Sequence, residues 1–280
     1  MRLPLLFRLL KIGVLGIGFT ILTFNADTLA AEENNNLAGE SSPSDTDKAG
    51  WFMGRQIART MSFHGANWLI RNSREQEEEP QKLIDALHLK PGQQVCDYGC
   101  GNGFYAIRLA QLVGPKGKVF AVDIQQEMLD LLDARSEARG INNVQPVLAT
   151  EKNSHLQANK LDWLLMVDVY HELSYPGEVL AEIRKSLNPL GRIALVEYRE
   201  EDPTVPIKPL HKMSQAQALK ELTANGFKLV GQFDDLPWQH VLYFARDDSP
   251  RPSVHLVAWE AAKSEPEQAT EASGGALGGK

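Results

Sequence analysis

The stretch VCDYGCGNGFYAIRLA, Val95 to Ala110, decides the fold of this chain. A short apolar run ends at Asp97, glycines alternate from Gly99 to Gly103, and an apolar helical pattern begins at Phe104. Glycine allows another group to approach the backbone closely. A glycine-rich turn between a strand and a helix therefore predicts a ligand site.

The segments after this turn alternate between strand-like and helical patterns. The strand-like segments read as nearly continuous apolar runs, which are typical of strands buried on both faces. This alternation predicts an α/β fold with a doubly wound, mostly parallel sheet covered by helices. The expected strands are 94–98, 118–124, 144–148, 161–169 and 192–198, and the expected helices are 104–113, 126–139 and 176–187.

The pattern changes after residue 198. The segment SQAQALKELTANG predicts a helix that begins with a capping box of Ser214 and Gln217 and stops at Gly226. The strand-like segments 227–233 and 240–245 are joined by a connection too short for a parallel crossover, so we expect an antiparallel pair. Residues 253–259 suggest one more extended piece. The complete prediction is a seven-stranded, Rossmann-like sheet with a C-terminal antiparallel strand pair.

The composition limits the class of partner. The chain has 280 residues, is 43% hydrophobic and carries a formal net charge of −7. No basic cluster follows the N-terminal segment, so we expect no nucleic acid partner. A small-molecule acceptor is the favoured partner, and no obligate protein partner is evident. The only cysteines, Cys96 and Cys100, are expected to be structural.

The first 30 residues have the three parts of an export signal. Arg2 and Arg8 lie in a charged start, an apolar stretch follows from Ile12 to Phe24, and small residues surround Ala30. We therefore expect an exported protein, periplasmic or secreted. If the signal is not cleaved, these residues would associate with the membrane and hold the domain outside the cytoplasm.

Two cofactor classes use a glycine-rich first turn. The dinucleotide fingerprint would place its third glycine at Phe104, and Asp97 would repel a pyrophosphate. S-adenosyl-L-methionine has a cationic amino group, a sulfonium and no phosphate, and would be attracted by that carboxylate. Asp123, which ends the next strand, is placed to bind both ribose hydroxyls, as an acid also does in dinucleotide folds.

On these residues the chain resembles the class I S-adenosylmethionine-dependent methyltransferases, over about Leu83 to Ala245. The segment DVYHEL resembles a bacterial subgroup whose substrate is unassigned. Where the family often has an aspartate near the adenine, this chain has Thr150 and Glu151. The cofactor contacts implied by the resemblance, or by position beside it, are Asp97, Tyr98, Gly99, Gly101, Gly103, Asp123, Ile124, Met128, Thr150, Glu151 and Asp168.

The candidate catalytic residues directly follow the fourth strand. His171 is the first choice as general base, because an imidazole titrates near neutral pH. Glu172 is expected to orient it, and Tyr170 is a further candidate. The alternative is that His171 is a hydrogen-bonded structural residue. His171, His211 and His240 could also gather a metal with Glu172 or Glu197, but their spacing does not support such a site, so no metal is expected.

The segment before the sheet is expected to form a lid. Ile57, Met61 and Trp68 suggest short amphipathic helices broken near Gly65, and Glu75–Glu79 predicts a solvated helical face. The complete expected division is a signal peptide or anchor (1–30), a disordered linker (31–50), an N-terminal helical lid (51–80), a methyltransferase domain (81–247) and a mostly disordered C-terminal extension (248–280).

The expected function is methyl transfer from S-adenosyl-L-methionine to a small-molecule or protein acceptor. Two other classes stay open. One is a nucleoside-binding module without turnover, and the other is a nicotinamide-dependent oxidoreductase.

Overall fold

The computed structural model describes residues 50–260. The predicted signal or anchor, nearly all of the linker and residues 261–280 lie outside the described residues. Within the described range, no helix is long and apolar enough to cross a membrane.

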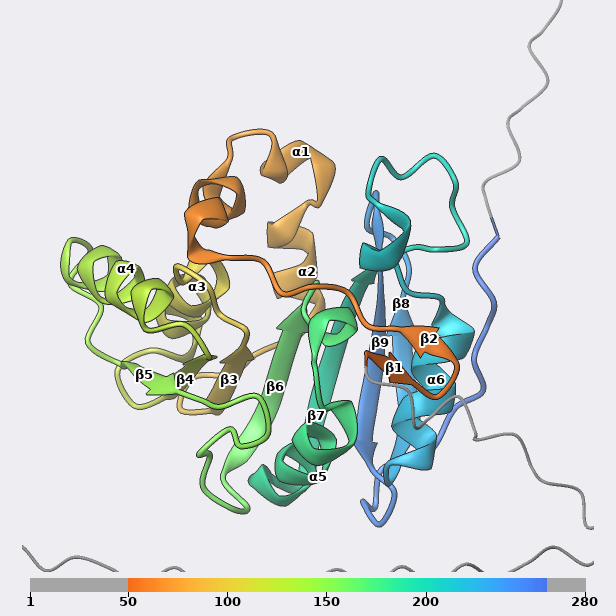
Figure 1. Ribbon diagram of the computed structural model, residues 1–280. Coiled ribbons are helices and arrows are strands. Elements are labelled where there is room, and N and C mark those ends of the chain that lie inside the picture. Colours follow the sequence, from red (N-terminus) through yellow and green to blue (C-terminus); the bar gives the residue numbers. More distant parts are fainter. Residues whose placement is uncertain (1–49, 261–280) are drawn as a thin grey trace, which may run out of the picture. The chain divides into compact units, whose positions relative to one another are not determined.

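A seven-stranded sheet with the order β5-β4-β3-β6-β7-β9-β8 forms the centre of the fold (Figure 1). Neighbouring strands are parallel from β5 to β7, whereas β9 is antiparallel to both β7 and β8. The predicted fold class is confirmed. The strands are β3 (Gln94–Tyr98), β4 (Lys118–Asp123), β5 (Val144–Leu148), β6 (Leu161–Val167), β7 (Leu187–Tyr198), β8 (Phe227–Phe233) and β9 (Gln239–Arg246).

Helices cover both faces of this sheet, and each face has its own apolar cluster. Val95 belongs to the cluster beneath α2, α3 and α4, whereas Cys96 belongs to the cluster beneath α5 and α6. Because successive strand residues point to opposite faces, a sheet covered on both sides needs continuous apolar runs. The helices are α2 (Pro80–Ala86), α3 (Phe104–Val113), α4 (Gln126–Glu137), α5 (Pro176–Ser186) and α6 (Gln215–Ala224).

Residues 57–62, here called the strap, run across the carboxyl ends of the central strands (Figure 1). They connect a small hairpin, β1 (Trp51–Phe52) and β2 (Arg55–Gln56), to the 3-10 helix η2 (Phe63–Ile70) and the short helix α1 (Arg74–Glu77). The break predicted near Gly65 is wrong: η2 continues through it, and the Gly65 N–H donates to the Ser62 carbonyl at 2.8 Å.

Three local expectations need correction. Strand β6 ends at Val167, because Asp168 takes a φ of 53° that no strand residue adopts. The hydroxyl of Ser214 accepts from the Gln217 N–H, but the Gln217 side chain donates to other groups, so only half of the capping box forms. Residues 253–259 form no strand, although the Val254 N–H donates to β8 at 3.0 Å.

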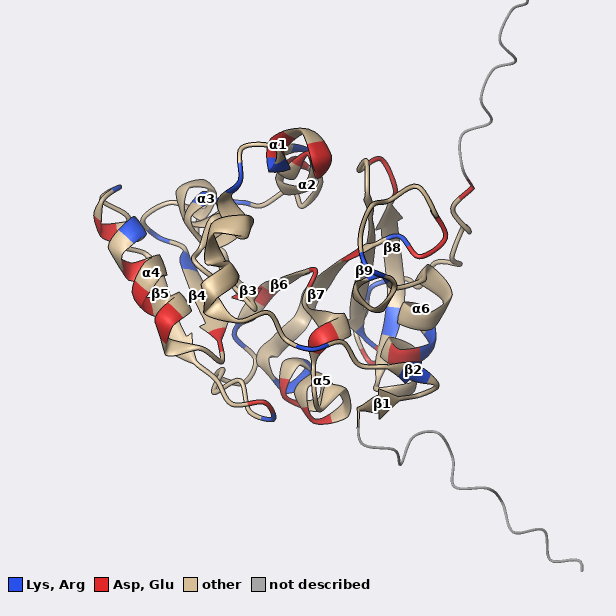
Figure 2. Ribbon diagram, turned by 45° about the horizontal axis from the view of Figure 1, so that its top comes forward, with Lys and Arg blue, Asp and Glu red and all other residues tan. Residues whose placement is uncertain are grey.

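Charged residues are distributed unevenly over the helices. Figure 2 shows acidic residues along the outward side of α4, whereas Lys and Arg are dispersed over several elements. The acidic positions on α4 share a spacing of three or four residues and are exposed. They are Glu127, Asp130, Asp133 and Glu137.

Candidate functional site

A cavity of about 750 Å³ lies at the carboxyl edge of the sheet, beside the point where strand order reverses between β3 and β6. Ligands of open α/β sheets bind at this place, in cavities of about 300–1,000 Å³. The strap and η2 form part of its wall. The strand ends contribute Tyr98, Gly99, Gly101, Asp123, Ile124 and Asp168, and Met128, Thr150 and Glu151 also line it.

The glycine turn can only be built from glycine. Gly99 and Gly101 have φ values of 73° and 51°, where other residues are strained. A Cβ on Gly99 would lie 2.5 Å from Val169 Cγ2, and one on Gly101 would lie 2.5 Å from Leu69 Cδ1. Gly103 differs, because it packs against Leu132 of α4 and is not part of the cavity wall. The turn therefore leaves open backbone on the cavity side.

Asp123 holds the turn in place and faces the cavity. Its Oδ2 accepts from the Gly101 N–H at 2.9 Å, and its Oδ1 accepts from the Gln125 N–H at 2.9 Å. Burial raises the pKa of this carboxyl. Each carboxylate oxygen can accept a second hydrogen bond, so Asp123 can bind the two hydroxyls of a ribose while it orders the turn.

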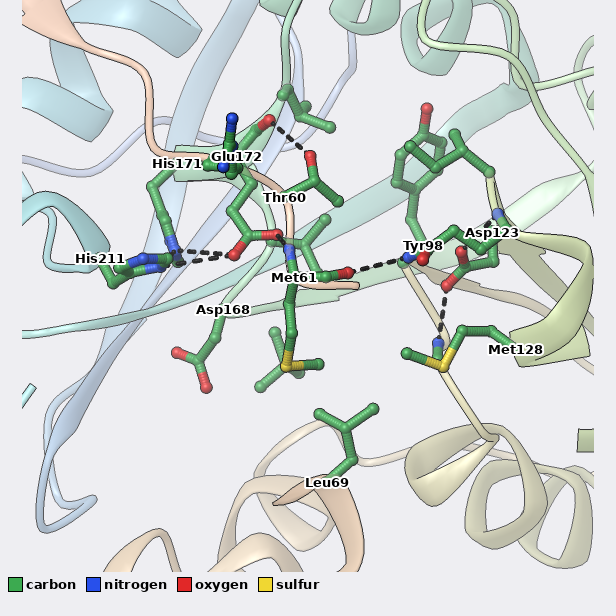
Figure 3. Close-up of a pocket in the computed structure, with 18 of the residues that line it drawn as sticks. Thr60, Met61, Leu69, Tyr98, Asp123, Met128, Asp168, His171, Glu172 and His211 are labelled. Carbon is green, nitrogen blue, oxygen red and sulfur yellow. Dashed lines mark hydrogen bonds and ion pairs between the residues drawn. The ribbon is translucent and has the colours of Figure 1, made fainter. Parts of the chain in front are cut away.

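A second carboxylate, Asp168, faces the cavity more directly than Asp97 does. Asp168 Oδ2 accepts from Gln239 Nε2 at 2.8 Å, while its buried Oδ1 has no hydrogen-bond partner within residues 50–260. Figure 3 shows this carboxylate pointing away from β6 into the cavity. Burial raises its pKa well above the ordinary value.

Asp97 lies beneath the turn and outside the cavity wall, with 3% of its surface exposed. Burial raises its pKa to about 7, and its Oδ2 has no hydrogen-bond partner in the described part of the chain. The direct contact predicted for Asp97 is therefore not formed by the wall of this cavity. Asp168 is the carboxylate that lies in the cavity wall, where Asp97 was predicted to contact the ligand.

Glu78 is a site residue that the sequence interpretation missed. The solvated face predicted for Glu75–Glu79 is wrong at this position, because Glu78 is fully buried. Its carboxylate accepts from Arg74 and Arg71 at 2.7 Å each and from the Tyr198 hydroxyl at 3.0 Å. All four side chains line the cavity. The spacing of Arg74 and Glu78, one helical turn apart, is the signal that could have indicated this pair.

His171 lies in the 3-10 helix η3 (Tyr170–Glu172) and is 2% exposed. Its Nδ1 is 2.6 Å from Glu197 Oε2, at the end of β7, and its Nε2 is 3.1 Å from His211 Nδ1. Because a carboxylate can only accept, Nδ1 carries a proton, and Nε2 is the ring nitrogen that faces His211. Glu197, and not the predicted Glu172, orients this histidine.

Glu172 and His211 complete a cluster around His171 Nε2, as Figure 3 shows. Glu172 Oε2 accepts from the Met61 N–H of the strap at 3.1 Å, and Oε1 lies 3.4 Å from His211 Nδ1. Burial raises the pKa of Glu172 and lowers that of His211, which belongs to the 3-10 helix η4 (Pro209–His211). The cluster combines two imidazoles with a carboxylate on one wall of the cavity.

Two other candidates lie elsewhere. Tyr170 is fully buried and donates its hydroxyl to Glu221 at 2.8 Å, so the structure places this predicted catalytic residue away from the cavity. His240 is also fully buried, outside the cavity wall, and burial lowers its pKa to about 3. Of the three histidines considered for a metal, only His171 and His211 come together.

Residues 89–247 match a family model described as a methyltransferase domain, and the chain belongs to this family. It is 30% identical over 154 residues to a demethylmenaquinone methyltransferase of Lactobacillus johnsonii, covering 54% of this chain and 60% of that protein. A protein-L-isoaspartate O-methyltransferase of Ignicoccus hospitalis is 23% identical over 145 residues, covering 52% of this chain and 65% of that protein. The chain thus spans less than two thirds of these curated relatives.

A solved SAM-dependent methyltransferase from Aquifex aeolicus is similar in structure and sequence. Its TM-score is 0.63 at 27% identity, and the match covers 66% of this chain and 98% of that one. S-adenosyl-L-methionine is the cofactor of this class. The cavity fits it in three ways: the glycine turn exposes backbone, Asp123 can accept from ribose hydroxyls, and Asp168 Oδ1 is free to meet a cationic amino group.

Proposed function

We propose that the chain is an S-adenosyl-L-methionine-dependent methyltransferase that methylates an oxygen, nitrogen or sulfur atom of a small-molecule acceptor. The observation that carries this proposal is the position of the His171 imidazole, which Glu197 orients. It faces the same cavity as the glycine turn, Asp123 and Asp168. A nucleoside-binding module would need the glycine turn and the two aspartates to hold its ligand, but it would not need an oriented histidine.

Residues from the strand ends would hold the cofactor. Asp123 would bind the ribose hydroxyls, Ile124 and Met128 would lie beside the adenine, and Asp168 would pair with the amino group. When bound, the cofactor supplies a methyl group on a sulfonium, which an acceptor atom displaces in line. Asp168 has a raised pKa without such a cation, so a positive charge near Oδ1 would stabilise its ionised form.

The opposite wall would bind the acceptor. Glu197 fixes the ring of His171, so that Nε2 can accept a proton from an acceptor group or orient its lone pair towards it. The strap covers this wall, because Met61 bonds to both Glu172 and Gln125 through its backbone. A partly covered cavity favours a small acceptor over the side chain of a folded protein.

We also propose that the protein is exported, on the basis of the charged, apolar and small-residue pattern of residues 1–30. Fractionation of cells that express the tagged full chain tests this, and recovery of the tag with the cytoplasmic fraction would refute it. An exported enzyme also needs a supply of cofactor outside the cytoplasm.

The activity is tested by S-adenosylhomocysteine release with a panel of hydroxyl, amine and thiol acceptors. We expect release with at least one acceptor class, and a marked loss of release in His171→Ala without loss of cofactor binding. Cofactor binding without release by any acceptor would favour the binding module instead.

A further inference from the structure

His171, Glu172 and His211 bring three donor atoms together at the cavity wall. His171 Nε2, His211 Nδ1 and a Glu172 oxygen all lie within 4.8 Å of one another. The residues come from η3 and η4, which are separated in the sequence by α5 and β7. Sequence spacing therefore gave no sign of this grouping.

The distances between these donors suit a metal ion. Two ligands about 2.0–2.1 Å from an ion at tetrahedral angles are about 3.3 Å apart. The two nitrogens are 3.1 Å apart and share a hydrogen bond, whose proton would leave to solvent when the ion binds. Glu172 Oε1 is 3.4 Å from His211 Nδ1. The remaining separation, from Glu172 Oε1 to His171 Nε2, is 3.9 Å, and a small rotation of the Glu172 side chain would shorten it.

A second set of contacts orients each of these ligands. A metal-binding histidine usually donates its other ring N–H to a carboxylate, which fixes the tautomer and the ring plane. His171 has this arrangement, because its Nδ1 is 2.6 Å from Glu197, a residue with no exposed surface. Glu172 is held in the same way, since Oε2 accepts from the Met61 N–H and Oε1 stays available.

The charges around the cluster are also those of a cation site. Glu197 and Glu172 place two carboxylates beside two imidazoles, with side-chain exposures of 0% and 13%. Of the described ion pairs, those of Glu197 and Glu172 involve only these histidines. Buried carboxylates require a compensating positive charge. Arg55, which donates to the His171 carbonyl at 3.1 Å and pairs with Glu221, lies nearby, and a divalent ion would add positive charge at the cluster itself.

We propose that His171, His211 and Glu172 bind one divalent first-row transition-metal ion at the acceptor wall of the cavity. Two imidazoles and a carboxylate form the ligand set that such ions accept while keeping positions open for a substrate. The use of the ion in catalysis rests on the proposed function. With the ion bound, His171 Nε2 would be a ligand and would no longer act as the base. The ion would instead lower the pKa of an acceptor hydroxyl, whose proton would leave to solvent. The oxygen–methyl bond then forms as the sulfur–methyl bond breaks, and S-adenosylhomocysteine is released.

The test uses the full chain after chelation and dialysis, titrated with Co²⁺ and followed by its visible absorption. We expect saturable binding at one ion per chain, with the bands of low coordination number and a rise in Tm. Binding should be abolished in His211→Ala and in Glu172→Gln, which keeps an acceptor for Met61. In Glu197→Gln the affinity should fall by about 10- to 100-fold, because the supporting carboxylate is lost. His64→Ala removes an exposed histidine outside the cavity wall and should leave binding unchanged.

Absence of stoichiometric Co²⁺ binding, or equal binding by the parent and the Glu172→Gln variant, would overturn the proposal. Glutamine has the same size as glutamate, so the Glu172→Gln variant still tests the proposal if His211→Ala fails to fold. The two proposals fail separately. Methyl transfer by a protein that binds no metal would refute the metal site and support the methyltransferase function. Co²⁺ binding without transfer to any acceptor would support the metal site and refute the methyltransferase function.

Discussion

Replacing Asp123 by Asn should weaken cofactor binding without unfolding the domain. The two oxygens of Asp123 accept from different N–H groups, those of Gly101 and Gln125. Asparagine has one acceptor oxygen, so its amide group must face one of these donors. The glycine turn then loses one of its two anchors, and the ribose hydroxyls lose a charged acceptor.

The size of the effect follows from the lost interaction. A hydrogen bond to a charged group contributes about 1.5–3 kcal/mol, which corresponds to about 10- to 150-fold in affinity. Titration calorimetry with S-adenosylhomocysteine measures this directly. We expect the dissociation constant of Asp123→Asn to rise within that range, while circular dichroism shows the same secondary structure as the parent.

Asp162 provides a matched control at the opposite edge of the sheet. Its carboxylate also accepts two hydrogen bonds, from the Gln94 N–H at 2.8 Å and from Asn188 at 2.9 Å. Asp162→Asn should reduce stability to a similar degree and leave the dissociation constant unchanged. A dissociation constant of Asp123→Asn within about threefold of the parent would refute the role of this carboxylate, as would equal weakening by Asp162→Asn.

Three further predictions test other parts of the site. Gly101→Ala should weaken cofactor binding in calorimetry, because alanine is strained at a φ of 51° and its Cβ would displace Leu69 Cδ1 of the cavity wall. Gly140→Ala, with a φ of 64° and no atom within 4 Å, should cost only about 1 kcal/mol in denaturant unfolding and leave binding unchanged. His171→Ala should slow S-adenosylhomocysteine release by about 100-fold or more and keep the parent's dissociation constant; unchanged release would exclude it from catalysis. The folded-state pKa of Asp97, about 7, exceeds its ordinary value of 3.8, so the folded chain retains a proton that the unfolded chain loses. The unfolding free energy of the parent should therefore fall relative to Asp97→Asn by up to about 1.4 kcal/mol per pH unit between those two pKa values, and parallel pH profiles would contradict this.

The local structure around the glycine turn was predicted correctly from the sequence. Strand, turn and helix follow one another within residues 94–113, and the glycine spacing reports the shape of that turn directly. Asp123 is likewise placed by the end of an apolar strand. These features can be predicted without information about distant segments, because the spacing of apolar residues and the type of turn are determined within a few neighbouring residues.

The parts that depend on distant segments were not predicted. Glu197 meets His171 only because β7 lies beside β6 in the sheet, and His211 arrives through a further loop. The sequence places Glu78 in a run of charged residues that is typical of a solvated face. Its burial depends on Arg71 and Arg74, which donate to its carboxylate beside the cavity. The positive φ of Asp168, which turns its carboxylate into the cavity, cannot be predicted from the pattern of residues around it.

The most direct test of the account is equilibrium dialysis of the full chain with radiolabelled S-adenosyl-L-methionine, with and without excess NAD. Saturable binding that excess NAD does not displace is the predicted result. Displacement by NAD, or no retention of the labelled cofactor, would contradict the assignment of this cavity to a sulfonium nucleoside.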